Sequence, residues 1–297
     1  GPVHLVGLSM GGMIGFQFAV DHPAWLRSLC IVNSAPEVKL RSRDDYWQWA
    51  KRWTLARVLS LATHRATEFA PTTVHYKTLG TSAKGLRELS KSLNTTSNTL
   101  LTALIAQTFL AMAPNDPQAV AAIRISVDLR RYFPEGQAPQ FGNHVATFVV
   151  RATHQPSLAQ QIASLDAQVK AGLARLERRE QALPLLLYEW LPLIGRTLYS
   201  KILLQAKRKG SLEQVSIHFT NLGSAEFINP EGAERRLAEM WPITNSTGLL
   251  IAALTLNDRQ LFSVCHPRND HPVEAVERFM DNLDQQVTSL IELGAQP

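Results

Sequence analysis

A chain of 297 residues is long enough for one large domain or two ordinary ones, and its 45% hydrophobic content permits a proper core. The formal net charge of +5 is spread thinly, apart from the cluster Lys207-Arg208-Lys209, which we interpret as the last turn of a helix. Because this cluster has no interleaved aromatic residues and belongs to no nucleic-acid-binding motif, nucleic acid is excluded as an expected partner.

The first predicted elements surround the segment Gly7-Leu8-Ser9-Met10-Gly11-Gly12. An apolar run at 3–6 predicts a strand before it, and apolar residues at helical spacing over 13–19 predict a helix after it. A strand, a tight turn of small residues and a helix form the context in which Gly-x-Ser-x-Gly acts as a nucleophile elbow. Such a turn exposes the serine at a helix N-terminus, where backbone N–H groups stabilise a developing negative charge.

This segment resembles the α/β-hydrolase family, on the residues 2–14, Ala19, Asp21-His22-Pro23 and 29–36. The resemblance implies that Ser9 is the nucleophile, that the N–H of Met10 is one oxyanion donor, and that residues 29–36 continue into the next parallel strand. Arginine, lysine and tryptophan spacing over 40–62 suits an amphipathic helix, the start of a cap in that family. We therefore assign residues 1–65 to a hydrolase fragment, and we expect the chain to be a segment of a longer precursor, or a processed or engineered product.

Residues 66–84 give a weak signal, with Pro71 and Gly80 as breakers, and we interpret them as a junction. Beyond it, Thr95-Thr96 and Ser157 are expected to cap helices. Further segments follow in chain order: strands at 122–127 and 145–150, a long helix after Ser157, an apolar helix ending at 209, strands at 215–223, 248–256 and 260–266 with a hairpin turn at 256–259, and a final helix at about 272–293.

We assign residues 85–297 to a second part, of which residues 85–295 resemble the C-terminal half of the CoA-dependent acyltransferase superfamily, which includes condensation domains. The resemblance rests on residues 95–103, on 127–130 with 132–134, on Phe141-Gly142-Asn143 and on 220–223. It implies an α/β fold class, in which a short βαβ hydrolase fragment is joined to one lobe with a mixed sheet and flanking helices. The family has two such lobes with a substrate tunnel between them. Arg130 and Asn143 would line the tunnel and Asn221 would lie at the lobe interface, or each is a simple turn or strand-end polar group.

Neither half contains a complete set of catalytic residues by sequence. The family's His-His-x-x-x-Asp motif is absent, although its histidine is the general base of acyl transfer. Asp258 followed by His266 or His271 has the right order to serve Ser9, but Asp258 lies at a predicted hairpin tip. The remaining histidines are isolated, and we interpret them as structural. No metal-ligand spacing, phosphate loop or dinucleotide fingerprint is present, so no metal and no covalently bound cofactor is expected.

Three functions stay open. The first is a serine ester hydrolase or thioesterase centred on Ser9, catalytically incomplete as this chain. The second is a CoA- or carrier-dependent O-acyltransferase lobe, with an acyl thioester as substrate, working with a partner lobe or as a homo-oligomer. The third is an inactive fusion or fragment that acts as a binding module.

Location is inferred from two patterns. Cys30 and Cys265 lie in apolar strand-like runs, which indicates buried thiols in a reducing, cytoplasmic compartment. The apolar region 183–204 is too interrupted by charge and proline to cross a bilayer. It is expected to form a core helix, to cover an acyl tunnel or to make a peripheral membrane contact.

Overall fold

The structure is a computed structural model, and it describes residues 3–8, 22, 24, 26–32, 39–40, 57–62, 71–137, 144–178, 180–181, 195–209, 215–232, 236–244 and 248–294. The chain divides into two compact units, which are taken one at a time below. Unit 1 comprises Gly1–Thr54, Val127–Thr147 and Ala171–Leu203, and unit 2 comprises Leu55–Ser126, Phe148–Lys170 and Leu204–Pro297.

Unit 1 contains two parallel strands near the start of the chain, β1 (Val3–Leu8) and β2 (Leu26–Val32). They pair from His4 opposite Ser28 to Leu8 opposite Val32. This pairing confirms the predicted parallel strands, while the predicted helix between them lies outside the described residues. A second short parallel pair joins β3 (Lys39–Leu40) to β8 (Glu180–Gln181).

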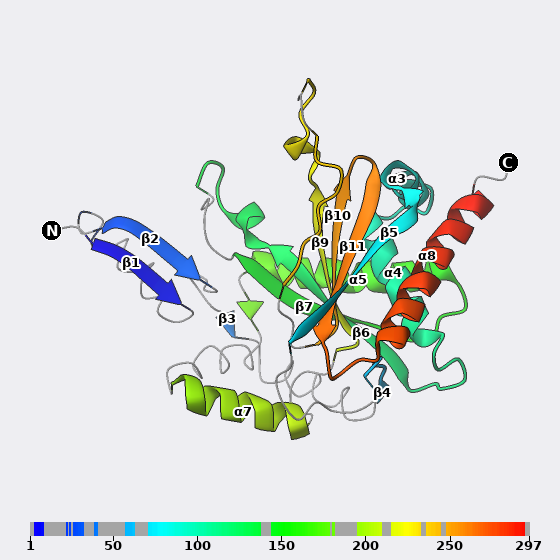
Figure 1. Ribbon diagram of the computed structural model, residues 1–297, viewed down its shortest axis with the longest axis horizontal. Helices are drawn as coiled ribbons and strands as arrows, with labels where there is room; N and C mark the ends of the chain where they lie inside the picture. Colours follow the sequence, from blue (N-terminus) through cyan, green and yellow to red (C-terminus); the bar gives the residue numbers. More distant parts are fainter. Residues whose placement is uncertain are drawn as a thin grey trace. The chain divides into compact units, whose positions relative to one another are not determined.

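Unit 2 is built on a seven-stranded mixed sheet with the order β4-β6-β9-β10-β11-β5 and with β7 paired to β6 (Figure 1). Its strands are β4 (Arg57–Val58), β5 (Thr72–Ser82), β6 (Ala119–Asp128), β7 (Val145–Ala152), β9 (Ile217–Ser224), β10 (Leu250–Leu256) and β11 (Arg259–Pro267). The neighbours β6, β9 and β10 run parallel, whereas β10, β11 and β5 alternate in direction. The predicted mixed sheet is therefore confirmed.

The predicted hairpin is confirmed in detail. Leu256 pairs with Arg259, so two residues form the loop between β10 and β11. These residues, Asn257 and Asp258, have φ angles of +52° and +55°. Two successive positive φ angles are the signature of a type I′ turn, whose twist matches that of the strands, and asparagine and aspartate tolerate this conformation better than most residues.

Helices cover one face of this sheet. They are α3 (Ala83–Ser92), α4 (Ser97–Leu110), α5 (Leu158–Glu177) and α8 (Val273–Gly294), and α8, red in Figure 1, runs beside β5. The side chain of Thr96 caps α4 by accepting from the Thr99 N–H, and Ser157 accepts from the Gln160 N–H at the start of α5. Both predicted caps are thus confirmed.

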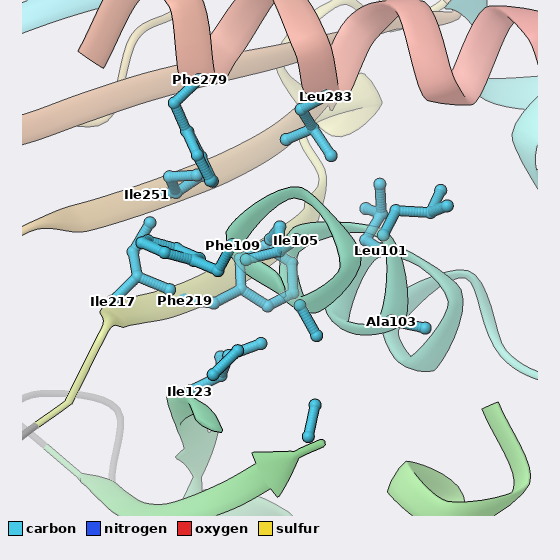
Figure 2. Close-up of a cluster of buried hydrophobic side chains, with 14 of the residues drawn as sticks. Leu101, Ala103, Ile105, Phe109, Ile123, Ile217, Phe219, Ile251, Phe279 and Leu283 are labelled. Carbon is cyan, nitrogen blue, oxygen red and sulfur yellow. The ribbon is translucent and has the colours of Figure 1, made fainter. Parts of the chain in front are cut away.

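The core lies between these helices and the sheet. Phe109 of α4 packs against Phe279 of α8 with ring centroids 4.7 Å apart, and Figure 2 shows Phe219 and Ile251 from two strands beside them. These side chains are almost completely buried. Burial of large apolar side chains is the main stabilising term in such a unit, at about 1.5–3 kcal/mol each.

Two segments differ from the sequence expectation. Residues 66–84, interpreted as a junction, contain β5, an edge strand of the sheet. Its composition is rich in threonine and its Tyr76 is 54% exposed, so it lacks the apolar alternation that marks a half-buried strand. The end of the predicted helix over 40–62 is also wrong, because Arg57 and Val58 form β4 and pair with β6. At these two residues the pairing with β6 determines the conformation, although the local spacing of apolar residues suits a helix.

Among the described residues, no helix combines the length and the apolar character that a membrane crossing requires. Cys265 is a buried free thiol, as predicted.

Candidate functional site

The residues of the proposed nucleophile elbow, Ser9 and Met10, lie outside the described residues, as does Asn143. What the structure describes is the strand before them. β1 ends at Leu8 and is paired in parallel with β2 up to that residue. Ser9 is thus the first residue after a parallel strand, which is the sequence position that an elbow serine occupies.

Asp258 lies at the exposed tip of the β10–β11 hairpin. Its side chain is 52% exposed, accepts a hydrogen bond from the Lys84 N–H at 2.8 Å and faces Arg87 at 3.7 Å. Its backbone carbonyl accepts from the Ala83 N–H at 2.8 Å. These contacts join the hairpin to the start of α3, which is a structural role.

His266 lies at the opposite end of β11 from Asp258. The two residues are eight positions apart in the sequence, which corresponds to about 25 Å at the rise of an extended strand. The structure therefore does not bring Asp258 together with His266, nor with His271, whose ring lies 5.4 Å from that of His266. Instead, it brings His266 to His75 on the neighbouring strand β5.

The rings of His75 and His266 are stacked, with centroids 5.2 Å apart and planes inclined by 14°. Their Nε2 atoms face each other at 3.0 Å. His266 is fully buried, and its Nδ1 lies 3.0 Å from the carbonyl oxygen of Pro267. Since a carbonyl only accepts, His266 Nδ1–H donates there, and its Nε2 accepts from His75 Nε2–H in the neutral pair.

The remaining ring nitrogen of His75, Nδ1, lies 3.8 Å from Glu277 Oε1 of α8. Burial lowers the pKa of His75, the nearby His266 lowers it further, and the Glu277 carboxylate opposes both effects. Burial and His266 outweigh the carboxylate, so the His75 ring is neutral near pH 7.

Two of the residues predicted to line the tunnel or the lobe interface make local contacts. Arg130, in the short 3₁₀ helix η2 (Leu129–Tyr132), lies 3.2 Å from the Asp128 carboxylate, which also accepts from the Arg130 backbone N–H. Asn221 Oδ1 accepts from the Gly223 N–H at 2.9 Å, and Gly223 has a φ angle of +77°. Both arrangements fit the alternative interpretation as turn and strand-end polar groups.

A second polar cluster lies on the sheet face opposite α4 and α8. Arg124 of β6 is in register with His218 of β9, and both point away from the core because Ile123, Ile125 and Phe219 point into it. Ser126 Oγ lies 2.7 Å from His218 Nε2. Burial and the adjacent Arg124 charge lower the pKa of His218 to about 4, so its ring is neutral near pH 7.

Sequence reasoning missed both clusters, because it treated His75 and His218 as isolated. The contact between His75 and His266 joins residues 191 positions apart, and the contact between Ser126 and His218 joins residues 92 positions apart. Period-two spacing places each histidine on a face of its strand, but the partner depends on strand order, which no local pattern encodes. In the described part of the chain, no group of three or more metal-ligating side chains is positioned to hold a metal ion.

No family model matches this sequence, and no curated protein matches it. Solved structures do match by fold. The PapA2 acyl transferase has a TM-score of 0.55 and 10% identity, covering 94% of this chain and 62% of that chain. The TRI3 trichothecene 15-O-acetyltransferase from Fusarium sporotrichioides has a TM-score of 0.52 and 16% identity, covering 83% and 52%. The first condensation domain of the calcium-dependent antibiotic synthetase has a TM-score of 0.53 and 14% identity, covering 84% and 51%.

At these identities the likeness establishes the fold alone: a mixed sheet with flanking helices, of the kind found in condensation and acyltransferase domains. The chain spans 51 to 62% of the length of these three solved chains. None of the three structures named above is a hydrolase, so the resemblance of the first segment to that family stays a prediction.

Proposed function

We propose that this chain contributes to acyl transfer as one lobe of a condensation- or acyltransferase-type enzyme, with an acyl thioester of CoA or of a carrier as the donor. The observation that carries the proposal is the seven-stranded mixed sheet, whose fold is shared with an acyl transferase, an O-acetyltransferase and a condensation domain. The chemistry is a proposal because fold alone does not specify a reaction.

In this reaction a general base removes the proton of an acceptor hydroxyl or amine as its oxygen or nitrogen attacks the thioester carbonyl, and the thiolate leaves and takes up a proton. The nine histidines of the chain include no two adjacent ones, so the family's His-His-x-x-x-Asp base is not present. Of the described histidines, His218 has a pKa of about 4 and is a weak base. The base is therefore proposed to come from a second lobe, in the same or another chain.

Thioester binding by the chain itself is the direct test. Acetyl-CoA and a longer acyl-CoA are added to the purified protein, and the melting temperature is measured beside that with free CoA. A ligand that binds only the folded state stabilises it by about 2.7 kcal/mol at a hundredfold excess over Kd. We expect the acyl-CoA to raise the melting temperature without release of free thiol. An unchanged melting temperature with both acyl-CoA and carrier thioesters would contradict the proposal.

A second candidate function, ester hydrolysis at Ser9, is supported by the position of that serine directly after the parallel strand β1. A fluorophosphonate probe reacts with an activated serine hydroxyl. Labelling that is abolished in Ser9→Ala and kept in Ser126→Ala would favour this function, since Ser126 is the described serine that contacts an imidazole. Folded protein with neither labelling nor thioester binding would favour the inactive binding module.

A further inference from the structure

Helix α7 (Arg196–Lys209) differs from the other described helices in its charge. Its sequence, RTLYSKILLQAKRK, contains five lysines and arginines and no aspartate or glutamate. The formal charge of the whole chain is +5, so this short helix carries a local excess equal to the net charge of the protein. A helix with this composition attracts an anionic partner at low ionic strength.

The exposed face of α7 also carries apolar side chains. Leu198 is 50% exposed and Ile202 is 37% exposed. Residues four apart lie on the same face of a helix, so these two side chains are neighbours there. Lys201 lies next to Ile202 and is exposed, and Thr197 and Gln205 are exposed as well. Exposed leucine and isoleucine beside a cation, on one face of a helix without acidic residues, suit a partner that is both apolar and negatively charged.

We propose that α7 binds the surface of an anionic lipid bilayer, with its axis parallel to the membrane plane. At 1.5 Å per residue its fourteen residues extend over about 21 Å, which is long enough for a surface-lying helix. Leu198 and Ile202 enter the boundary between headgroups and acyl chains, and Lys201 contacts lipid phosphates. The sequence before α7, LPLLLYEWLPLI at 183–194, is apolar apart from Glu189 and contains one tyrosine and one tryptophan, residues that are typical of membrane interfaces, which favours lipid over an acidic protein as the partner.

Vesicle flotation tests this proposal with the full chain. Vesicles of phosphatidylcholine alone are compared with vesicles that contain about one third phosphatidylglycerol, at low and high salt. We expect binding to the anionic vesicles only, and we expect high salt to weaken it because each surface cation is screened. Equal binding to both vesicle types, or no binding to either, would overturn the proposal.

Two variants separate the charge from the apolar contact. Lys201→Glu is expected to weaken binding about tenfold, because it replaces an attractive charge near the surface by a repulsive one. The double variant Leu198→Ser with Ile202→Ser is expected to weaken it by a similar factor through lost apolar burial. Circular dichroism and thermal unfolding should stay unchanged, since these side chains are exposed.

Phe227→Ser is the matched control. Phe227 is 80% exposed, more than either α7 residue, but it lies in the 3₁₀ helix η4 (Glu226–Ile228), which contains an acidic residue and no cation. Its replacement should leave vesicle binding unchanged, and an equal loss in this variant would mean unspecific apolar adhesion and would overturn the proposal. Binding to soluble polyglutamate without binding to vesicles would assign α7 to an acidic protein instead.

Discussion

The two histidine contacts of unit 2 lie on opposite faces of the same sheet and differ in what surrounds them. His266 is fully buried under α8 and meets a second imidazole, with Glu277 beyond it. His218 lies on the other face, partly exposed, and meets the hydroxyl of Ser126 with Arg124 next to it. Burial is the largest cause of the lowered histidine pKa on both faces, and the neighbouring charge modifies it in opposite directions: Glu277 raises the pKa of His75, whereas Arg124 lowers that of His218 further.

The largest expected effect comes from removing the buried ring. His266→Ala deletes the acceptor for His75 Nε2–H and leaves a cavity in a fully buried position, so it should lower the free energy of unfolding by about 3 kcal/mol. His218→Ala, at the partly exposed site, should cost about 1 kcal/mol. Urea unfolding of both variants at pH 7 measures the difference. Equal losses would mean that burial does not distinguish the two sites.

Lowering the pH is expected to have the next largest effect on the free energy of unfolding, chiefly through His218. Its pKa is about 4 in the folded protein and 6.5 in the unfolded chain, so the unfolded state binds more protons between these values. The free energy of unfolding is therefore highest above pH 6.5, where His218 is neutral in both states, and it falls as the pH drops toward 4. At pH 5 the loss is about 2 kcal/mol relative to pH 7. His75, whose pKa is also lowered, adds a loss of the same sign.

The matched variant for this prediction is His218→Gln, which keeps a polar side chain that does not titrate. Unfolding free energies at several pH values should then show a shallower slope below pH 6.5 than in the natural chain, with the His75 contribution remaining. An unchanged slope would mean that His218 is protonated in the folded protein and would contradict its low pKa.

These clusters also mark the limit of what could be predicted from the sequence. The strands β6, β9, β10 and β11 and the helix α8 follow from local apolar patterns, and the caps at Thr96 and Ser157 follow from residue chemistry. Edge strand β5 was missed because its threonines give no apolar alternation. Local patterns are short-range signals, so they locate elements better than they locate contacts between elements.

The candidate site was less predictable for the same reason. His266 was singled out because it follows Ser9 and Asp258 in chain order, but the fold places Asp258 at the other end of the strand and supplies His75 as the neighbour. The pairing depends on the antiparallel register that sets His75 opposite Val264. A register is fixed by tertiary packing, which a single sequence does not display.

A smaller effect on stability is expected from replacing Glu277, whose carboxylate faces His75. Glu277 raises the pKa of His75 against the effects of burial and of His266. Glu277→Gln removes that negative charge, so the pKa of His75 should fall further, and the imidazole should titrate at a lower pH in an NMR experiment. Stability at pH 7 should change by less than about 0.5 kcal/mol, because Glu277 is exposed and the ring is neutral there. A rise in the pKa would contradict the assigned contact.

Ser126→Ala on the opposite face is expected to change the free energy of unfolding without changing the pKa of His218. The variant removes the hydroxyl that lies 2.7 Å from His218 Nε2, a hydrogen bond between neutral partners that is worth about 1 kcal/mol or less at a partly exposed site. The pKa of His218 should stay low, because its causes are burial and the charge of Arg124, neither of which involves the hydroxyl. NMR titration of the ring together with urea unfolding at pH 7 separates these two quantities. A pKa that returns to its ordinary value would show that Ser126, and not burial, keeps His218 neutral, and it would make the two faces of the sheet alike in depending on a hydrogen-bonding partner.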